Sequence, residues 1–475
     1  MVDPPPDELQ ALWRATLARI EHAAMGLRAR HVGSDAGREE ADTWTQGLDF
    51  SAARAPAEVL ALLANGLEHG QVQTAHPRYF GLPQAAPAAV ALVAGALADA
   101  YNPQLATRGH APFAVALEDR LLAAFGERFG FPAGETEGVF TSGGAEANAT
   151  ALLAALAHAF PDVGARGVRA LAGDPTVYVS AEGHPTIARA ARMAGLGTAA
   201  VRVIPADGQA RMKVTALRES IGRDRAAGAL PFLIVATAGT TSSGAIDPLA
   251  ALADVAARAK CWLHVDAAWG GMAALVPALA AHLDGIARAD SITFDPHKVL
   301  SVPLGTGMVL TRRRGALTNV FRERAGYMPR DPSRDPYARG MTWSRRFAGA
   351  AVFAVLATAG WDGLAASLRA QAAIADRLRA ALASDGWTIV NDTPLPVVCF
   401  CDATRPDGAT PRFLEAVARA VIASEGGWLS VTRLSTGARA LRAGVTVHRT
   451  EERDVDRLVA ALADARRAIV SAPSP

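Results

Sequence analysis

The chain has 475 residues, half of them hydrophobic, so we expect one large domain with a smaller companion. Its formal net charge is +2, from 48 basic and 46 acidic residues mixed along the chain. Such a balance predicts no nucleic-acid or membrane-surface partner, and a small charged metabolite fits better.

Residues 1–75 are predicted to form an N-terminal helical arm, because 7–25 carry apolar residues at helical spacing and a second helix opens at Pro56. Residues 76–345 are predicted to form a large domain in which β-rich runs alternate with Ala-rich helical stretches. The runs are GVFTS, TVYVS, AVRVI, FLIVATAG, CWLHVDAA, SITFD and GMVLT. This alternation predicts an α/β fold with a mostly parallel sheet covered by helices on both faces.

Residues 312–345 lack apolar periodicity and are rich in Arg, Asp, Pro and Gly, so we expect a long functional or disordered loop. Residues 346–475 are predicted to form a smaller C-terminal α/β domain. It contains a helix at 346–384, the strand runs WTIVN and PVVCFC, a helix at 411–424 and a final helix.

The three cysteines are too few for a secreted disulfide framework. Cys399 and Cys401 stand in an apolar run, so we expect them to pack in the core rather than bind metal. The start MVDPPPDELQ has no signal-peptide pattern, and we expect no stretch that approaches a membrane span. The sequence therefore predicts a cytoplasmic protein.

Gly143 and Gly144 follow the predicted strand GVFTS and lead into a helix near Glu146. Free backbone N–H groups at a helix start bind anions, and glycine lets a phosphate approach closely. An ordinary tight turn between strand and helix is the alternative interpretation.

Asp266 ends the predicted buried strand in HVDAAWGG. A buried carboxylate is costly unless it meets a cation, and a protonated pyridine nitrogen is one such cation. Pairing with Asp266 keeps such a ring protonated, so that it can accept electrons from a breaking bond. The alternative is a carboxylate that caps a helix.

The chain has only three lysines, Lys213, Lys260 and Lys298. The first two stand in polar helical stretches and are predicted to be exposed. Lys298 follows an Asp-Pro-His turn after the strand SITF, where burial lowers the pKa of an amine and frees it to react with an aldehyde.

GGAEAN, the GHP around His184, HVDAAWGG and DPHK together resemble the group II pyridoxal 5′-phosphate (PLP)-dependent amino acid decarboxylases, which include aromatic amino acid and glutamate decarboxylases. The resemblance covers about residues 45–465. It implies a fold of the aspartate aminotransferase type (fold type I) and a homodimer with active sites at the subunit interface.

The resemblance also implies roles for single residues. Lys298 would hold PLP covalently, Asp266 would pair with the pyridine nitrogen, and His184 would stack on the ring and move protons. The remaining implied cofactor contacts surround the phosphate and the other ring face: Gly144, Ala145, Thr240, Ala268 and His297.

HPRYFG at 76–81 resembles the family segment that lines the substrate pocket, through His76, Tyr79 and Phe80. Both aromatic residues could instead be core. Arg442 matches the arginine that faces the substrate carboxylate.

The segment 326–343 resembles a mobile catalytic loop whose tyrosine protonates the product carbon. Tyr327 is the predicted donor, and Tyr337 is the alternative. Prolines inside the segment and glycines near its ends are typical of a lid, although a disordered surface loop is the other interpretation.

The implied reaction converts an L-amino acid to its amine and CO₂, and the aromatic pair favours an aromatic substrate. Three other reactions remain open: decarboxylation of an acidic amino acid, carbon–carbon bond cleavage, and aldehyde-forming decarboxylation. A catalytically silent dimer is the alternative from another class.

Overall fold

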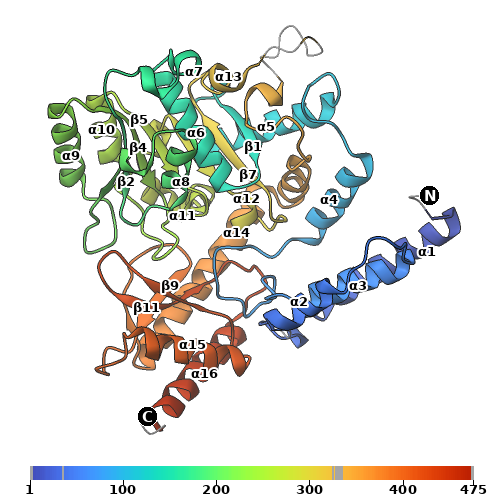
Figure 1. Ribbon diagram of the computed structural model, residues 1–475. Coiled ribbons are helices and arrows are strands. Elements are labelled where there is room, and N and C mark those ends of the chain that lie inside the picture. The colour runs from blue at the N-terminus through green and yellow to red at the C-terminus, as the bar shows by residue number, and fades with distance from the viewer. Residues whose placement is uncertain (1–3, 35–36, 324–325, 327–334, 472–475) are drawn as a thin grey trace.

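The computed structural model describes residues 4–34, 37–323, 326 and 335–471. Two sheets and a projecting helical arm make up the chain (Figure 1). The strands are β1 (Glu137–Thr141), β2 (Pro175–Ser180), β3 (Val201–Ile204), β4 (Leu230–Thr237), β5 (Trp262–Asp266), β6 (Ser291–Phe294), β7 (Gly307–Thr311), β8 (Thr388–Ile389), β9 (Val397–Cys401), β10 (Ser430–Arg433) and β11 (Arg439–Gly444).

The α-helices are α1 (Pro6–Met25), α2 (Arg38–Gln46), α3 (Pro56–His69), α4 (Ala89–Tyr101), α5 (Pro112–Arg128), α6 (Gly144–Ala159), α7 (Val163–Arg166), α8 (Thr186–Met193), α9 (Val214–Ala226), α10 (Leu249–Ala259), α11 (Pro277–Ala280), α12 (Pro296–Val299), α13 (Thr318–Phe321), α14 (Gly349–Ser384), α15 (Pro411–Ala423) and α16 (Glu452–Ser471). Two 3₁₀ helices matter below, η6 (Ile286–Arg288) and η7 (Pro336–Ala338).

The larger sheet has the strand order β1-β7-β6-β5-β4-β2-β3, and all seven strands match the predicted runs. The pairs among β3, β2, β4, β5 and β6 are parallel. Strand β7 runs antiparallel to both β6 and β1. The sheet is therefore mixed but mostly parallel, as predicted, and its parallel strands end along one edge.

Alternate residues of the central strands face opposite layers. Leu233 and Val235 of β4 pack with α6 and α8, whereas Ile234 and Ala236 pack with α5, α9 and α10. Because both faces are covered, these strands are continuous apolar runs rather than alternating ones. This packing fixes α6 directly over the strand ends that carry the site.

The smaller sheet is antiparallel, in the order β10-β11-β9-β8, and packs with α15 and α16. Strands β10 and β11 were not predicted. The chain also crosses between domains near its start, because the N–H of Phe80 donates to the carbonyl of Trp428 at 2.8 Å. Phe80 therefore belongs to the core of the smaller domain.

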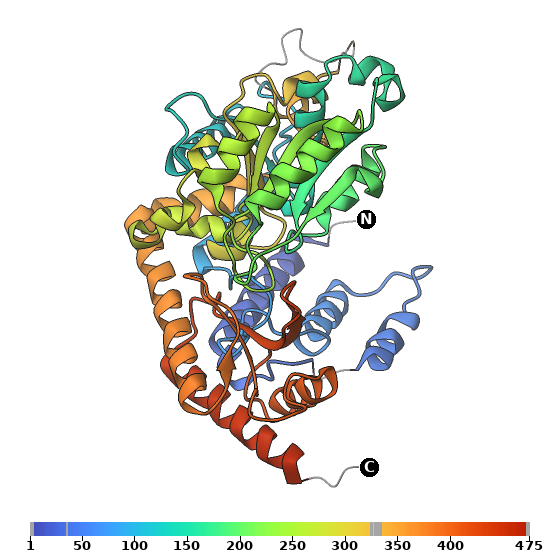
Figure 2. The same ribbon diagram turned by 90° about the vertical axis from the view of Figure 1, so that its left-hand side faces the viewer.

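Helix α14 runs from the larger domain along the smaller one, as Figure 2 shows, and bends where Gly360 takes φ 63°. It packs against α4, α5 and α16. Of the described helices it alone is long and apolar enough to span a membrane by composition, so the expectation of no such stretch was too strict. Its contacts with three helices are those of a domain-bridging helix.

All three cysteines are buried, which confirms the prediction of core packing. Within the residues that the structure describes, no cluster of His, Cys, Asp and Glu is arranged to hold a metal ion. Lys213 and Lys260 are exposed, as predicted, at the start of α9 and the end of α10.

Candidate active site

An active-site cavity of about 250 Å³ lies at the carboxyl edge of the larger sheet. Thr237 ends β4, Asp266 ends β5 and Asp295 follows β6, and all three line the cavity. In open α/β sheets ligands bind outside the carboxyl ends of the strands. The start of α6 and the residues around His184 complete the wall.

Asp266 is held by two hydrogen bonds, from the amide Nδ2 of Asn148 at 2.8 Å and from the N–H of Ala268 at 3.2 Å. A carboxylate only accepts, so Asn148 must turn its amide nitrogen to Asp266 and its oxygen away. That oxygen accepts from Thr293 Oγ1 at 2.7 Å and lies 3.0 Å from His264 Nε2. The aspartate is therefore held in a fixed position at the cavity wall.

His264 is the second support of this network. With Nε2 donating to Asn148, its Nδ1 accepts from the hydroxyl of Ser291 at 2.8 Å. Complete burial lowers the pKa of His264 to about 4, so the ring is neutral at pH 7. Sequence reasoning missed Asn148 and His264, although both stand inside quoted motifs, GGAEAN and HVDAAWGG.

Lys298 is the one lysine that lines the cavity, and its side chain is about a quarter exposed. Its Nζ lies 2.9 Å from Oδ2 of Asp295, which is almost completely buried. The same oxygen accepts the N–H of Gly144 at 3.0 Å. Asp295 was interpreted only as part of a turn, but it aims the lysine amine into the cavity.

The backbone at the start of α6 includes an unused donor, the N–H of Ala145. Gly143 takes φ 151°, a conformation that favours glycine, and leads into the helix. Gly144 was expected to give its N–H to a phosphate, but that group donates to Asp295 instead. The N–H of Ala145 has no acceptor among the described residues, so it remains available to an anion.

His184 and His297 both line the cavity. His184 Nδ1 lies 3.0 Å from Thr186 Oγ1, and that hydroxyl also accepts from Asn148. Burial lowers the pKa of His184, and the charge of Asp266 partly opposes this shift. His297 donates from Nδ1 to the carbonyl of Thr306 at 2.7 Å, which leaves Nε2 as an acceptor.

Thr240, which was predicted to contact the cofactor, does not line the cavity. The hydroxyl of Thr240 is fully buried and bonds Ser243 Oγ at 2.8 Å inside its own turn. Thr241 lines the cavity in its place. Ala268, expected beneath the cofactor ring, does line the cavity.

None of the four predicted substrate-binding residues lines the cavity within a single chain. Tyr79 stacks on Trp428 with ring centres 5.3 Å apart, and His76 and Phe80 are fully buried. Their role toward substrate stays a prediction. Tyr79 and Phe80 are both buried among other side chains, which agrees with the alternative interpretation that they belong to the hydrophobic core.

Arg442 comes nearer to the cavity. It is buried and donates from Nε to the carbonyl of Thr241 at 2.8 Å and from Nη1 to that of Gly81 at 2.7 Å. Its Nη2 has no hydrogen-bond partner among the described residues. Burial lowers the pKa of this arginine, so its charge would gain from an anionic partner.

Of the two candidate loop tyrosines, Tyr327 and Tyr337, the structure describes only Tyr337. Tyr327 lies outside the described residues. Tyr337 is in η7, is 1% exposed and packs on Trp343 with ring centres 4.9 Å apart. It does not line the active-site cavity.

The sequence matches the pyridoxal-dependent decarboxylase conserved domain over residues 46–402. The chain belongs to this family, as its motifs predicted. Cysteine sulfinic acid decarboxylase of Rattus norvegicus is 39% identical over 244 residues, which are 51% of this chain and 49% of that protein. L-2,4-Diaminobutyrate decarboxylase of Rhizobium meliloti (strain 1021) is 37% identical over 303 residues, 63% of this chain and 59% of that protein.

These matches thus span roughly half to three fifths of the curated relatives' length. Solved structures agree over nearly the whole chain. Mouse CSAD superposes with a TM-score of 0.91 at 27% identity, covering 97% of this chain and 99% of that one. Oryza sativa TDC with PLP and tryptamine gives 0.91 at 25%, covering 99% and 100%. The fold is that of the PLP-dependent decarboxylases, fold type I.

The donor set of the cavity fits PLP. Lys298 supplies an amine, Asp266 a fixed buried carboxylate and Ala145 an unused N–H at a helix start. These three groups match an aldehyde, a pyridine nitrogen and a phosphate, respectively.

Proposed function

We propose that the protein is a PLP-dependent decarboxylase that converts an L-amino acid to its amine and CO₂. The observation that carries this proposal is the convergence of Lys298, Asp266 and His184 on one cavity. When bound, PLP supplies an electron sink for the bond that breaks at the substrate's α-carbon. The protein's own groups decide which bond that is.

Each residue then has a defined task. Lys298, oriented by Asp295, holds the cofactor aldehyde through its amine, and Asp266 keeps the ring nitrogen protonated. His184, held by Thr186, would contact the cofactor and move a proton at the α-carbon. Tyr327 is the proposed final proton donor.

Arg442 is the proposed anchor of the substrate carboxylate. Its unpartnered Nη2 and its bond to the cavity-lining Thr241 support this role. An arginine fork is well suited to bind a carboxylate in a fixed orientation.

For the substrate we propose an L-amino acid with an acidic side chain, such as cysteine sulfinate, aspartate or glutamate. The relatives that are 34–39% identical include cysteine sulfinic acid and acidic amino acid decarboxylases. The aromatic preference rested on Tyr79 and Phe80, and both are packed away from the cavity. Arg433 stands in a hollow of about 400 Å³ that shares His184 and Thr241 with the active-site cavity, where it can attract an anionic side chain.

The active form is proposed to be a homodimer. Apolar side chains are exposed along the arm in α1 and α3, including Trp13, Leu17 and Leu63. A further apolar groove of about 550 Å³ lies between α4 and α14, next to Phe113 and Phe353. The arm projects from the body of the chain (Figures 1 and 2), so a second copy is well placed to cover it.

The proposed compartment is the cytoplasm, consistent with three buried free thiols. The proposed partners are the amino acid and a second copy of the chain, with no nucleic acid and no membrane.

The direct test is CO₂ release from a panel of L-amino acids by the purified protein reconstituted with PLP. We expect acidic substrates to react fastest and Lys298→Ala to abolish release, whereas Lys213→Ala at the exposed start of α9 should retain it. Faster turnover of tryptophan or tyrosine would overturn the substrate proposal. No CO₂ from any amino acid would overturn the activity.

A further inference from the structure

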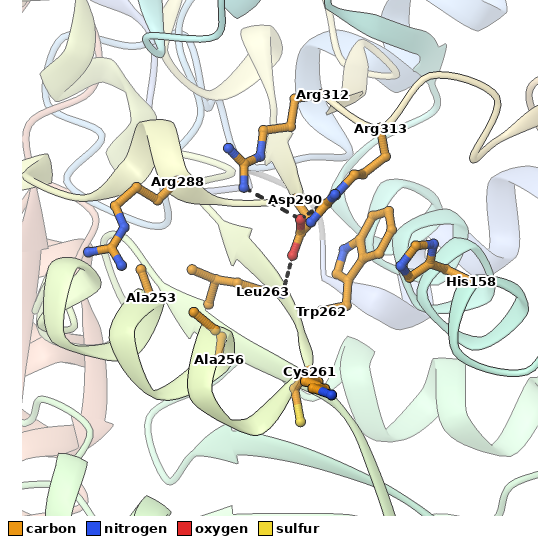
Figure 3. A pocket seen from close by; sticks show the side chains of 12 residues that line it. His158, Ala253, Ala256, Cys261, Trp262, Leu263, Arg288, Asp290, Arg312 and Arg313 are labelled. Carbon is orange, nitrogen blue, oxygen red and sulfur yellow. Dashed lines mark hydrogen bonds and ion pairs between the residues drawn. The ribbon is translucent and has the colours of Figure 1, made fainter.

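A second cavity, of about 390 Å³, lies at the opposite edge of the larger sheet (Figure 3). It is bounded by the end of α6, the face of α10, η6, and the residues at the starts of β5 and β6 and the end of β7. Trp262 opens β5 at this cavity, and Asp266 closes the same strand at the active site. A strand of five residues places the two ends about 13 Å apart, so the cavities are distinct.

Four cationic side chains line this cavity: Lys260, Arg288, Arg312 and Arg313. Of the described residues that line it, Asp290 alone is a carboxylate. Asp254, just outside, pairs with Arg288 at 2.7 Å. Four positive charges against these two carboxylates leave a local charge of +2.

Both carboxylate oxygens of Asp290 accept hydrogen bonds from residues of the cavity wall. Its Oδ1 accepts from Nε of Arg313 at 2.7 Å, and its Oδ2 accepts from the N–H of Leu263 at 2.9 Å. Figure 3 shows Arg312 and Arg313 both directed toward this carboxylate. Arg312 reaches it at only 3.7 Å, which is too long for a hydrogen bond.

Two of the cationic side chains, Arg312 and Lys260, have N–H groups without a hydrogen-bond partner in the described part of the chain. Nε of Arg312 is buried and has no hydrogen-bond partner in the described part of the chain. Lys260 lines the cavity with an exposed side chain, and its ammonium has no ion-pair or hydrogen-bond partner among the described residues.

The other wall is apolar and aromatic. Ala253, Ala256 and Leu263 line it, beside Trp262, whose ring packs edge-on to His158 at 5.3 Å. A polar anion-binding side opposite an apolar side is typical of sites for small organic ligands, and the volume lies in their range of about 300–1,000 Å³.

We propose that this cavity, named here the anion cavity, binds a small phosphate monoester. Such a group carries a charge close to −2 near pH 7, which matches the local charge of +2. Guanidinium forks and an ammonium are the side chains that bind phosphate oxygens. The organic part of the ligand would lie along Ala253, Ala256 and Leu263.

The test uses the PLP-loaded protein, so that the cofactor's own phosphate fills the active site. Calorimetric titration with glycerol 3-phosphate at fixed ionic strength should give one site per chain, whereas glycerol should not bind. Lys260→Asn and Arg312→Gln should each weaken binding about tenfold, because each removes a charged contact.

These variants are chosen to leave the fold intact. Lys260 has φ 50°, a left-handed conformation that asparagine tolerates. The side chain of Arg312 makes no hydrogen bond to the Asp290 carboxylate, and the backbone bond from the Arg312 N–H to the Asp290 carbonyl is kept in Arg312→Gln. Arg412→Gln, on an exposed position of α15, is the matched control and should bind as the unaltered protein does. Equal melting temperatures check folding.

Either of two results overturns the proposal: no saturable binding of glycerol 3-phosphate to the unaltered protein, or unchanged affinity in both cavity variants. Neither result depends on amino acid decarboxylation, so this inference and the proposed activity fail independently.

Discussion

Replacing Asp266 by asparagine isolates one charge at the centre of the proposed mechanism. The side chain keeps its size and can still accept the hydrogen bond that Asn148 donates at 2.8 Å. Its other end would then present an amide nitrogen to the N–H of Ala268, so a bond of 3.2 Å is lost. We expect a stability cost of about 1 kcal/mol and an intact fold.

The catalytic cost should be much larger. A charge-assisted hydrogen bond is about 2.8 Å long, and at an effective dielectric constant of about 20 this gives roughly 6 kcal/mol between the two charges. An amide supplies no charge, so the ring nitrogen loses its proton and the electron sink weakens. With each 1.4 kcal/mol worth tenfold, we expect CO₂ release to fall by roughly four powers of ten.

The assay is the rate of CO₂ release at saturating substrate, with cofactor retention followed by visible absorbance. Asp464→Asn, an exposed carboxylate of α16 that pairs only with Arg467 in the described structure, is the control and should keep full activity. If Asp266→Asn retains its cofactor and turns over at a near-normal rate, the proposed role of Asp266 is wrong.

Three further predictions follow from single residues. Borohydride reduction and peptide mapping should place the pyridoxyl label on Lys298, and a label on either other lysine would refute this assignment. Tyr327→Phe should retain PLP and substrate but lose amine formation, and in the presence of dissolved O₂ it should give aldehyde, ammonia and hydrogen peroxide instead. Normal amine formation in Tyr327→Phe together with its loss in Tyr337→Phe would transfer the role to Tyr337. Burial raises the pKa of Asp247 to about 6. The folded state binds this proton more tightly than the unfolded state does, so protonated Asp247 stabilises the fold by about 3 kcal/mol at low pH. This contribution is lost as the pH rises from about 4 to 6. Asp247→Asn should remove that loss in denaturant titrations across this range, and an unchanged pH dependence would contradict the shift.

The order of elements in the larger domain could be predicted from the sequence. Strands buried on both faces are short continuous apolar runs, and this pattern is local in the chain. The position of Lys298 was also predictable, because only three lysines exist and two stand in polar helical stretches. Asp266 was found for a similar local reason, as a carboxylate at the end of a buried strand.

The contacts that make the site work could not be predicted in this way. Asn148 and Asp266 are 118 positions apart, and Gly144 and Asp295 are 151 apart. Only the packing of α6 over β5 and β6 brings them together. Strands β10 and β11 were missed because their runs are short and mixed in polarity, and their pairing with β9 stabilises them.

The sequence by itself predicted the decarboxylase family and singled out Lys298 and Asp266, which both line the cavity, because motif residues and strand ends are local properties. Tertiary structure decided that Phe80 belongs to the core of the smaller domain, that Asp295 takes the N–H of Gly144, and that a second set of cations surrounds a cavity at the other edge of the sheet. Each of these outcomes depends on which distant segments share a space, and side-chain burial and hydrogen bonding across that space follow from the packed fold.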